Sequence, residues 1–227
     1  MRKLPDKSIN LIVTDPPYGI GINKMNFTIS RKGGLARRGD YKGKADWDKR
    51  LAKEYFDEMF RVSKNQVIFG GNYYTDVLPP TRCWLVWDKK VKDKYSNDFA
   101  DAELIWTSFD KNVRVIRWLW HGMIQQDMKN KEKRYHPTQK PVAVVRKILE
   151  MFSNRYDIIL DPFIGSGSTA VACVELGRFF LGFEIDPRWV SIAEKRLSSV
   201  QLGFWRDDYG RSNTRLKQEG VRDVKVS

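Results

Sequence analysis

The amino-acid sequence predicts a single α/β domain, and three observations support this fold class. The chain has 227 residues, which is long for one small domain and short for two. Short apolar runs typical of strands alternate with segments of helical spacing along most of its length. Between residues 157 and 184, a strand, a glycine-rich turn, a helix and a second strand follow one another. There is no internal repeat, and no shift in composition marks a domain boundary.

The individual elements follow from two kinds of residue pattern. Strands are expected where short runs are rich in β-branched and aromatic residues, and helices where apolar side chains recur three and four positions apart. Pro141 suits the first turn of one helix, and Gly177 is well placed to close another. Residues 122–133 are polar and lysine-rich and are expected to form a loop. The expected strands are 9–13, 66–70, 83–87, 102–106, 113–120, 157–160 and 179–183, and the expected helices are 51–62, 142–152, 170–176 and 187–200.

The charge balance favours a polyanionic partner. Lys and Arg number 41 against 28 Asp and Glu, which gives a formal net charge of +13. Such an excess favours nucleic acid, because basic side chains neutralise phosphates and release counterions. No apolar run approaches the roughly 18 residues of a membrane span and no signal segment follows Met1, so a cytoplasmic location is expected. Cys83 and Cys173 are expected to be buried thiols in a reducing compartment, and no metal-ligand spacing is present.

The stretch Thr14–Gly19 stands where the first expected strand ends. In open α/β sheets, this end of a strand is where ligands bind. Asp15 supplies a charged acceptor and Tyr18 an aromatic face, while Pro16 and Pro17 fix the backbone between them. The same stretch also fits an ordinary β-turn with a surface tyrosine, so the hexapeptide alone leaves both interpretations open.

A long basic segment follows this hexapeptide. Between residues 23 and 44, glycines alternate with basic side chains and there is little apolar periodicity. Structureless segments of this length are commonly functional, so we predict a mobile loop that contacts phosphates beside Asp15, with a solvated surface loop as the alternative. The residues expected to contact nucleic acid are Lys24, Arg31, Lys32, Arg37 and Arg38.

A second candidate site lies at the glycine-rich turn after residue 160. Gly165 and Gly167 allow the backbone to approach a ligand closely, and Glu184 follows at about the twenty-residue separation of an acid that binds ribose. A full dinucleotide-binding glycine motif and a phosphate-binding loop with its lysine are both absent. Asp161 at the strand end would repel phosphate and attract a cationic amine. These residues favour a positively charged nucleoside such as S-adenosylmethionine over NAD or ATP.

Three motifs occur in the order found in one enzyme family. Asp15-Pro16-Pro17-Tyr18, the hexapeptide His-Pro-Thr-Gln-Lys-Pro at 136–141, and residues 161–167 together resemble the amino-group DNA methyltransferases of the β arrangement. In that family, the catalytic motif precedes the cofactor-binding motif. The resemblance covers roughly residues 4–197. It implies a Rossmann-like, mostly parallel twisted sheet with helices on both faces, a single catalytic domain over residues 1–200 and a charged, peripheral tail over 201–227. It also implies S-adenosylmethionine as the cofactor and double-stranded DNA as the substrate.

The resemblance assigns most of the cofactor site to the glycine-rich turn. Asp161 would hold the methionine amino group, Glu184 the ribose hydroxyls, and Ile185 would pack on the adenine. Asp15 is also assigned to this site. The other residues implied are Phe163, Gly165, Ser166, Gly167, Ser168 and Thr169 around the turn, and His136, Thr138, Gln139 and Lys140 at the methionine end, with Thr138 and Lys140 as the closer contacts. For His136, the alternative is a loop residue that fixes the start of the next helix.

The resemblance gives the Asp15 motif a chemical role, with Asp15, Pro16, Pro17 and Tyr18 as catalytic residues. Hydrogen bonds from an exocyclic amine to the Asp15 carboxylate and the Pro16 carbonyl would free the nitrogen lone pair to attack the methyl group. The target base would be flipped out of the duplex and stacked on Tyr18. Adenine N6 is favoured over cytosine N4 because position 15 holds Asp rather than Ser.

Two departures from the family pattern affect cofactor binding and specificity. Only about a dozen residues precede Asp15, so a strand and an acid that members usually place there are expected to be missing or supplied elsewhere. The segment 121–135, where target recognition is expected, is short, so base reading would rest on residues 23–44, on this loop or on a partner subunit, with relaxed specificity as the alternative. A second copy of the chain and a cognate restriction endonuclease are further partners to test. Methylation of RNA and a DNA-binding relic without cofactor are the rival functions.

Overall fold

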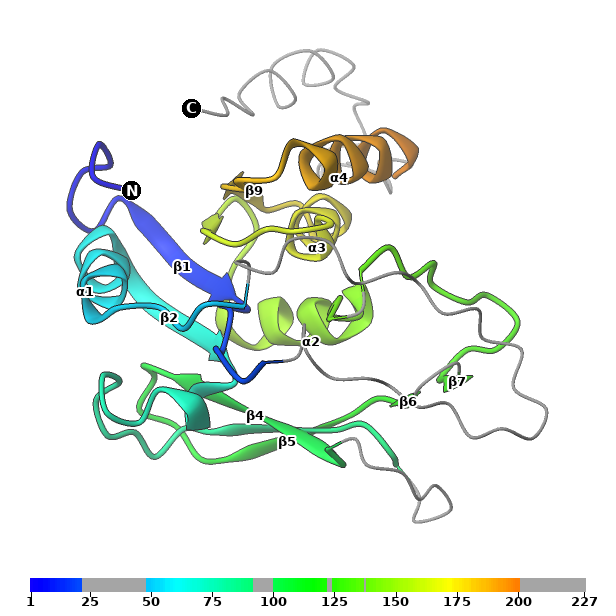
Figure 1. Cartoon of the computed structure of the whole chain (residues 1–227), viewed down its shortest axis with the longest axis horizontal. Coiled ribbons are helices and arrows are strands. Elements are labelled where there is room, and N and C mark those ends of the chain that lie inside the picture. The colour runs from blue at the N-terminus through cyan, green and yellow to red at the C-terminus, as the bar shows by residue number, and fades with distance from the viewer. Residues whose placement is uncertain (22–47, 92–99, 122–123, 137, 201–227) are drawn as a thin grey trace.

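A computed structural model describes residues 1–21, 48–91, 100–121, 124–136 and 138–200 of the chain. At its centre lies a seven-stranded sheet with the strand order β5-β3-β4-β2-β1-β8-β9 (Figure 1). Four strands form a parallel half. β1 (Ile9–Thr14) pairs with β2 (Ser63–Phe69) on one side and with β8 (Ile158–Asp161) on the other, and β9 (Phe179–Gly182) follows β8.

The other half of the sheet contains the one described strand that runs in the opposite direction within it. β4 (Ala102–Thr107) is antiparallel to both of its neighbours, β2 and β3 (Leu85–Asp88), and the edge strand β5 (Arg114–Arg117) is parallel to β3. The expected mostly parallel sheet is therefore confirmed. Because β4 is reversed, its beginning and not its end lies at the edge of the sheet where the parallel strands end.

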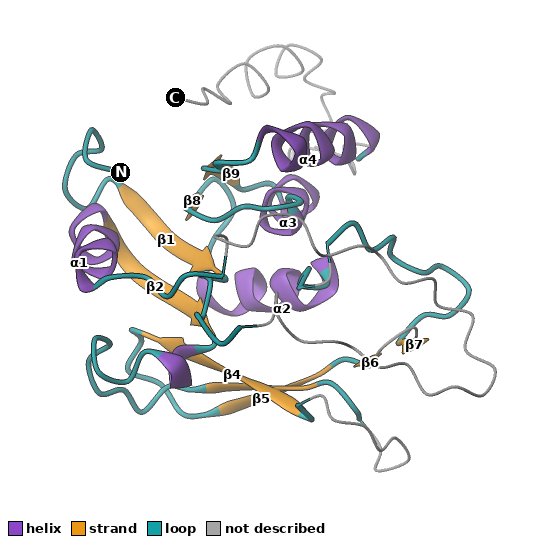
Figure 2. Cartoon of the chain, in the orientation of Figure 1, coloured by secondary structure: helices purple, strands orange, loops and turns teal. Residues whose placement is uncertain are grey.

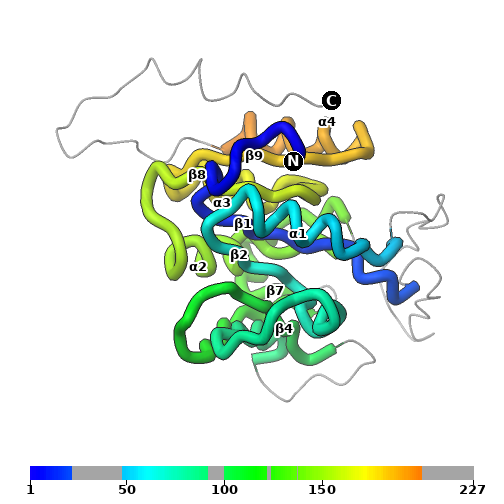
Figure 3. Tube along the Cα trace, turned by 90° about the vertical axis from the view of Figure 1, so that its left-hand side faces the viewer, coloured from blue at the N-terminus to red at the C-terminus, as the bar shows by residue number. Residues whose placement is uncertain are grey.

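Helices cover both faces of the sheet, as expected (Figure 2). α1 (Lys53–Val62) buries Phe56, Met59 and Val62 against one face, and Figure 3 shows it running beside β1 and β2. α2 (Val142–Phe152) and α3 (Ser168–Leu176) pack on the opposite face, and α4 (Pro187–Ser199) packs against α3. A short 3₁₀ helix, η2 (Gly71–Tyr73), follows β2.

Two apolar cores lie on the two faces. In β1, Leu11 and Val13 join the core under α2 and α3, whereas Ile12 joins the core under α1, because successive side chains of a strand point to opposite faces. All three side chains are almost completely buried. Burial on both faces is what a central strand of a parallel sheet requires, so the residue just after β1 has a rigid support.

Most of the expected elements are present, with small shifts at their ends, but one expectation is wrong. Residues 113–120 do not form a single strand. β5 ends at Arg117, opposite the last residue of β3, Asp88, although the amides of Trp118 and Trp120 still donate to the carbonyls of Asp88 and Lys89. From Trp120 on, the chain forms a small two-stranded pair, β6 (Trp120–His121) with β7 (Ile124–Gln125), so the expected loop 122–133 contains a short strand. Cys83 and Cys173 are buried free thiols, as expected. Among the described residues, no helix combines the length and the apolar character needed to cross a membrane.

Candidate active site

The parallel strands end at one edge of the sheet, and both predicted sites lie there. Asp15 follows β1, Asp161 is the last residue of β8, and Glu184 lies shortly after β9. β1 and β8 are neighbours, and the Thr14 hydroxyl donates a hydrogen bond of 2.7 Å to Asp161 Oδ1, across 147 positions of sequence. This bond joins the two motifs into one continuous site.

Asp161 is a buried carboxylate that is only 5% exposed. Its oxygens accept hydrogen bonds from the hydroxyls of Thr14 and Thr169, both at 2.7 Å, and from the amide of Phe163 at 3.1 Å. Burial raises the pKa of Asp161 to about 6, although these hydrogen bonds act in the opposite direction. All three donors are neutral, so a cationic group is the partner that would stabilise this carboxylate best.

The turn after Asp161 is shaped by glycine and by one fixed acid. Gly167 has a φ of +87°, and a Cβ on it would lie 2.9 Å from the Ala193 Cβ of α4. The amides of Gly165 and Asp186 donate to the two oxygens of Glu184, at 3.0 and 2.9 Å. Ile185, the next residue, is 98% exposed. A bare backbone, a fixed carboxylate and an exposed apolar side chain suit the ribose and base of a nucleoside.

Asp15 is engaged by two side chains of the protein itself. Lys140 Nζ donates to its Oδ2 at 2.6 Å, and the Tyr18 hydroxyl donates to its Oδ1 at 2.5 Å. The Tyr18 ring stacks on Tyr73, with ring centroids 4.6 Å apart, and covers Gly70, where a Cβ would lie 2.3 Å from the ring. Burial raises the pKa of Asp15 even though the Lys140 ammonium opposes this shift. Burial also raises the pKa of Tyr18 well above its usual range, so this phenol acts as a donor.

A row of alternating charges continues from Asp15 to the far side of the site. Beyond Lys140, which is 9% exposed, lies Glu103 near the start of β4, and Glu103 Oε2 is 3.4 Å from Lys140 Nζ. Lys89, just after β3, donates to Glu103 Oε1 at 2.8 Å. Burial opposes the charge on Glu103, but the ammonium groups of Lys140 and Lys89 outweigh it and lower its pKa. Burial likewise opposes the charge on Lys140, but Asp15 and Glu103 outweigh it and raise the pKa of this lysine.

The segment before α2, which carries Lys140, also contains His136 and Thr138. The Thr138 hydroxyl lies 2.8 Å from His136 Nδ1, and the His136 ring packs edge-on against Trp189 of α4. Burial, assisted by the nearby Lys140, lowers the pKa of His136 to about 4, so the imidazole is neutral at physiological pH.

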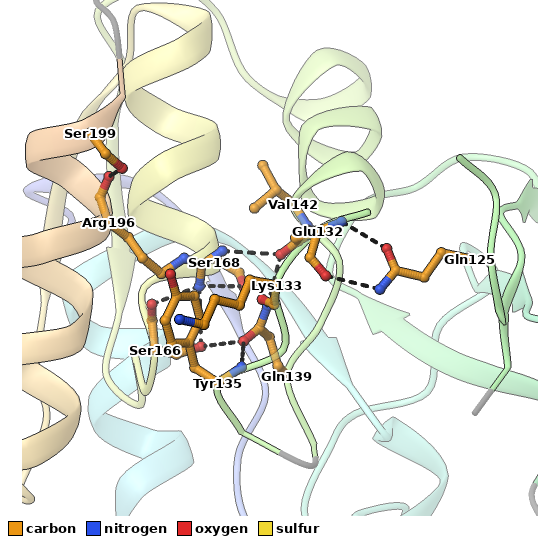
Figure 4. Close-up of polar contacts among 10 residues, drawn as sticks. All are labelled: Gln125, Glu132, Lys133, Tyr135, Gln139, Val142, Ser166, Ser168, Arg196 and Ser199. Carbon is orange, nitrogen blue, oxygen red and sulfur yellow. Dashed lines mark hydrogen bonds and ion pairs between the residues drawn. The ribbon is translucent and has the colours of Figure 1, made fainter. Parts of the chain in front are cut away.

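A buried polar network lies behind the glycine-rich turn, as Figure 4 shows. Arg196 of α4 donates to the Ser166 carbonyl at 2.7 Å and to Glu132 Oε1 at 3.0 Å. Gln139 donates to the same Glu132 oxygen at 2.8 Å and accepts from the Ser166 hydroxyl at 3.1 Å. The second oxygen of Glu132 accepts from the amide of Val142, the first residue of α2. The network therefore fixes the turn, the start of α2 and α4 relative to one another.

Comparison with known proteins agrees with this geometry. A family model described as DNA methylase, for N6 and N4 enzymes, matches residues 81–195. The putative methylase YubD of Escherichia coli K12 is 41% identical over 88% of this chain and 87% of its own. The chain belongs to this DNA methylase family. The methylase is also 26% identical to the type II methyltransferase M.HpaI of Haemophilus parainfluenzae, over 90% of this chain and 73% of that protein.

Solved structures share the fold of the methylase. The cytosine-N4-specific PvuII DNA methyltransferase aligns with a TM-score of 0.55 at 14% identity, covering 88% of this chain and 84% of its own. M1.HpyAVI, in a complex with SAM, aligns with a TM-score of 0.52 at 24% identity, covering 86% of this chain and 90% of its own. The expected Rossmann-like methyltransferase fold is therefore confirmed. As a member of the DNA methylase family, the methylase transfers methyl groups to DNA.

The structure of the methylase brings several of the predicted residues together. Asp15, Lys140, Asp161 and the glycine-rich turn lie at the same edge of the sheet, whereas Thr138 contacts His136, whose ring packs on Trp189 of α4. Lys140 was expected at the methionine end of the cofactor, and here its ammonium binds the Asp15 carboxylate. The predicted DNA contacts Lys24, Arg31, Lys32, Arg37 and Arg38, together with Pro137 and the tail 201–227, lie outside the described residues.

Sequence reasoning missed four charged residues around the site of the methylase. Glu103 lies near the beginning of β4, whereas ligand-binding residues are expected after the carboxyl ends of strands. Lys89 lies in the turn that follows β3. Glu132 lies in the segment expected to be a loop, and Arg196 lies within a helix. A buried Arg inside a helix pattern becomes recognisable only when its carboxylate partner is known.

Proposed function

We propose that the methylase transfers a methyl group to the N6 amine of adenine in double-stranded DNA, with Asp15 as the acceptor for that amine. The observation that carries this proposal is the hydrogen bond from Thr14 to Asp161. Asp15 is the next residue after Thr14, so a base amine on Asp15 lies beside the carboxylate that would hold the cofactor. The preference for adenine over cytosine rests on Asp rather than Ser at position 15.

The cofactor site of the proposal is built on Asp161. Its neutral surroundings suit the ammonium of S-adenosylmethionine, while Glu184 is positioned for the ribose and Ile185 for the adenine. When bound, the cofactor supplies a methyl group on a positively charged sulfur. The remaining contacts are assigned to Asp15, Phe163, Gly165, Ser166, Gly167, Ser168 and Thr169, and to His136, Thr138, Gln139 and Lys140.

Asp15 and Pro16 prepare the amine for attack. An exocyclic amine is a poor nucleophile because its lone pair is delocalised into the ring. Hydrogen bonds from the amine to the Asp15 carboxylate and the Pro16 carbonyl favour a pyramidal nitrogen whose lone pair points out of the ring plane. When the amine takes the methyl group from the sulfur of the cofactor, the C–S bond would break and the cofactor would leave with a neutral sulfur. The nitrogen would become positively charged, and the Asp15 carboxylate would stabilise that charge. The nitrogen then loses one proton, which Asp15 can accept because burial raises its pKa.

Tyr18 and the basic segments are assigned to the DNA. The Tyr18 ring, which stacks on Tyr73 in the structure, would stack on the flipped base instead. Pro17 would fix the backbone between Asp15 and Tyr18. The basic residues between 23 and 44 are proposed to contact phosphates, and residues 121–135 to contribute to target recognition within a catalytic domain of residues 1–200. The relatives named type II methyltransferases support a role in restriction and modification, with a cognate endonuclease as partner.

The proposal is tested by transfer of a tritiated methyl group to unmethylated genomic DNA, followed by nucleoside analysis. N6-methyladenine is the expected product, and label in RNA with none in DNA would contradict the proposal. Asp15→Ala should lower the rate by about 10²- to 10³-fold while calorimetry shows little change in S-adenosylmethionine binding. Asp57→Ala, on the exposed side of α1, is the control and should keep the wild-type rate.

Cytosine N4 is the second candidate acceptor. One solved structure with this fold is specific for cytosine N4, and the family model covers both kinds of enzyme. The Asp15 mechanism applies equally to either amine. N4-methylcytosine in the same nucleoside analysis would establish this alternative and leave the role of Asp15 unchanged.

A further inference from the structure

The charge row Asp15–Lys140–Glu103–Lys89 contains an ammonium that stands where the substrate must bind. Lys140 Nζ lies 2.6 Å from Asp15 Oδ2, at hydrogen-bonding distance for a charged pair. In this position, it neutralises the carboxylate that the proposed function requires as an acceptor. The ammonium also opposes a second positive charge, such as the one that develops on the amine nitrogen. Efficient transfer therefore requires Lys140 to leave Asp15 when the base arrives.

Glu103 offers Lys140 another place to bind. Its Oε2 is buried and accepts no hydrogen bond from the described residues, although Lys140 Nζ is only 3.4 Å away. Its other oxygen is held at 2.8 Å by Lys89, so the carboxylate is fixed in position. A shift of Lys140 by about half an ångström toward Oε2 would turn this ion pair into a charged hydrogen bond.

We propose that Glu103 is a positioning residue that takes the Lys140 ammonium from Asp15 when the target base enters the site. This inference rests on the proposed role of Asp15 as the acceptor for the amine. In the base-free enzyme, Lys140 protects Asp15 from being a buried charge without a partner. In the base-bound enzyme, the amine donates to Asp15 and Lys140 donates to Glu103, so every buried charge keeps a partner.

The shift has a direct effect on the chemistry. With Lys140 on Glu103, the full negative charge of Asp15 faces the nitrogen while that nitrogen becomes positive. The proton affinity of Asp15 also rises, because its closest positive charge has moved away. Lys140 moves only between two neighbouring carboxylates, so the net charge of the pocket does not change.

Glu103→Gln tests the inference because Gln keeps the shape and the acceptor for Lys89 but removes the negative charge. We expect kcat to fall about tenfold or more on genomic DNA, while the Kd for S-adenosylmethionine changes little. The loss of a carboxylate beside Lys140 and Lys89 should also lower the melting temperature, so the rates are compared at a temperature where both proteins are folded. A double-mutant cycle with Lys140→Met gives the second reading. Once Lys140 is absent, Glu103→Gln should change kcat by less than about twofold.

Two results would overturn the inference. One is a wild-type kcat for Glu103→Gln. The other is an equal fold decrease in kcat from Glu103→Gln in the presence and in the absence of Lys140, which would indicate a merely structural role. If Lys140→Met is itself inactive, a crystal structure with S-adenosylhomocysteine and methylatable duplex DNA decides: Lys140 on Glu103 supports the inference, and Lys140 on Asp15 overturns it.

Asp15→Ala separates this inference from the proposed function. An active Asp15→Ala enzyme would refute the proposed function whatever Glu103 does. An inactive Asp15→Ala enzyme combined with a fully active Glu103→Gln enzyme would refute only the inference.

Discussion

Replacing Asp161 with Asn should make the free protein more stable and weaken its binding of S-adenosylmethionine. Burial raises the pKa of Asp161 from its usual value of 3.8 to about 6, so ionisation is less favourable in the folded chain than in the unfolded chain. A difference of about two pH units corresponds to about 3 kcal/mol of folding free energy. This cost is absent well below pH 4, where the group is protonated in both states, and it is fully present above pH 6.

The side chain of Asn can keep the hydrogen bonds of this position. Its oxygen can accept from Thr14 and Phe163, and its amide can donate to the Thr169 hydroxyl, which accepts as well as donates. The free energy of unfolding of Asp161→Asn should therefore exceed that of the wild type by about 2 kcal/mol more at pH 8 than at pH 4. Urea denaturation at the two pH values measures this difference.

The loss of the charge should have the opposite effect on the cofactor. A hydrogen bond to a charged group contributes about 1.5–3 kcal/mol, so the Kd for S-adenosylmethionine should rise by about ten- to a hundredfold. Calorimetry at pH 8 measures it, and Asp57→Asn, an exposed residue of α1, controls for the loss of one negative charge. If the wild type and Asp161→Asn show the same pH dependence of stability, or the same affinity for S-adenosylmethionine, the role given to Asp161 is wrong.

Two further substitutions probe the support of the turn. Gly167→Ala places a Cβ 2.9 Å from the Ala193 Cβ, whereas a Cβ at Gly165, which also has a positive φ, would lie 4.0 Å from its nearest neighbour. Gly167→Ala should therefore lower the melting temperature more than Gly165→Ala does. Equal losses would show that backbone strain alone matters. Glu132→Ala leaves Arg196, which is 8% exposed, without its carboxylate and should destabilise the fold by about 3 kcal/mol in urea denaturation. Arg196→Met should recover part of that loss in the double variant, and a double variant as unstable as the single one would contradict this account.

The sequence was sufficient to predict the half of the fold that builds the cofactor site. The strand before Asp161, the helix after Gly167 and the acid at position 184 are local features, and each is set by a short pattern of apolar residues and glycines. The opposite half was harder to predict. The strand expected over 113–120 ends at Arg117 because its partner β3 ends at Asp88, and no pattern within the segment itself records the length of a neighbouring strand.

The same distinction applies to the candidate site. Asp15 and Asp161 carry local signals, because each follows or ends an apolar run and is followed by proline. The partner of Lys140 carries none, since Glu103 reaches the site only through the reversed direction of β4. The contacts of Asp15 could not be predicted either. Tyr18 comes from the same hexapeptide, but Lys140 comes from a segment 125 positions away, and no local pattern records that contact.

The hydrogen bond between Thr14 and Asp161 joins neighbouring parallel strands, and its geometry does not depend on which strand is made first. A rearranged gene that encoded β8, α3, β9 and α4 ahead of β1 would still place the two acids side by side at the edge of the sheet. Evolution can therefore reorder the segments of such an enzyme while its chemistry stays the same.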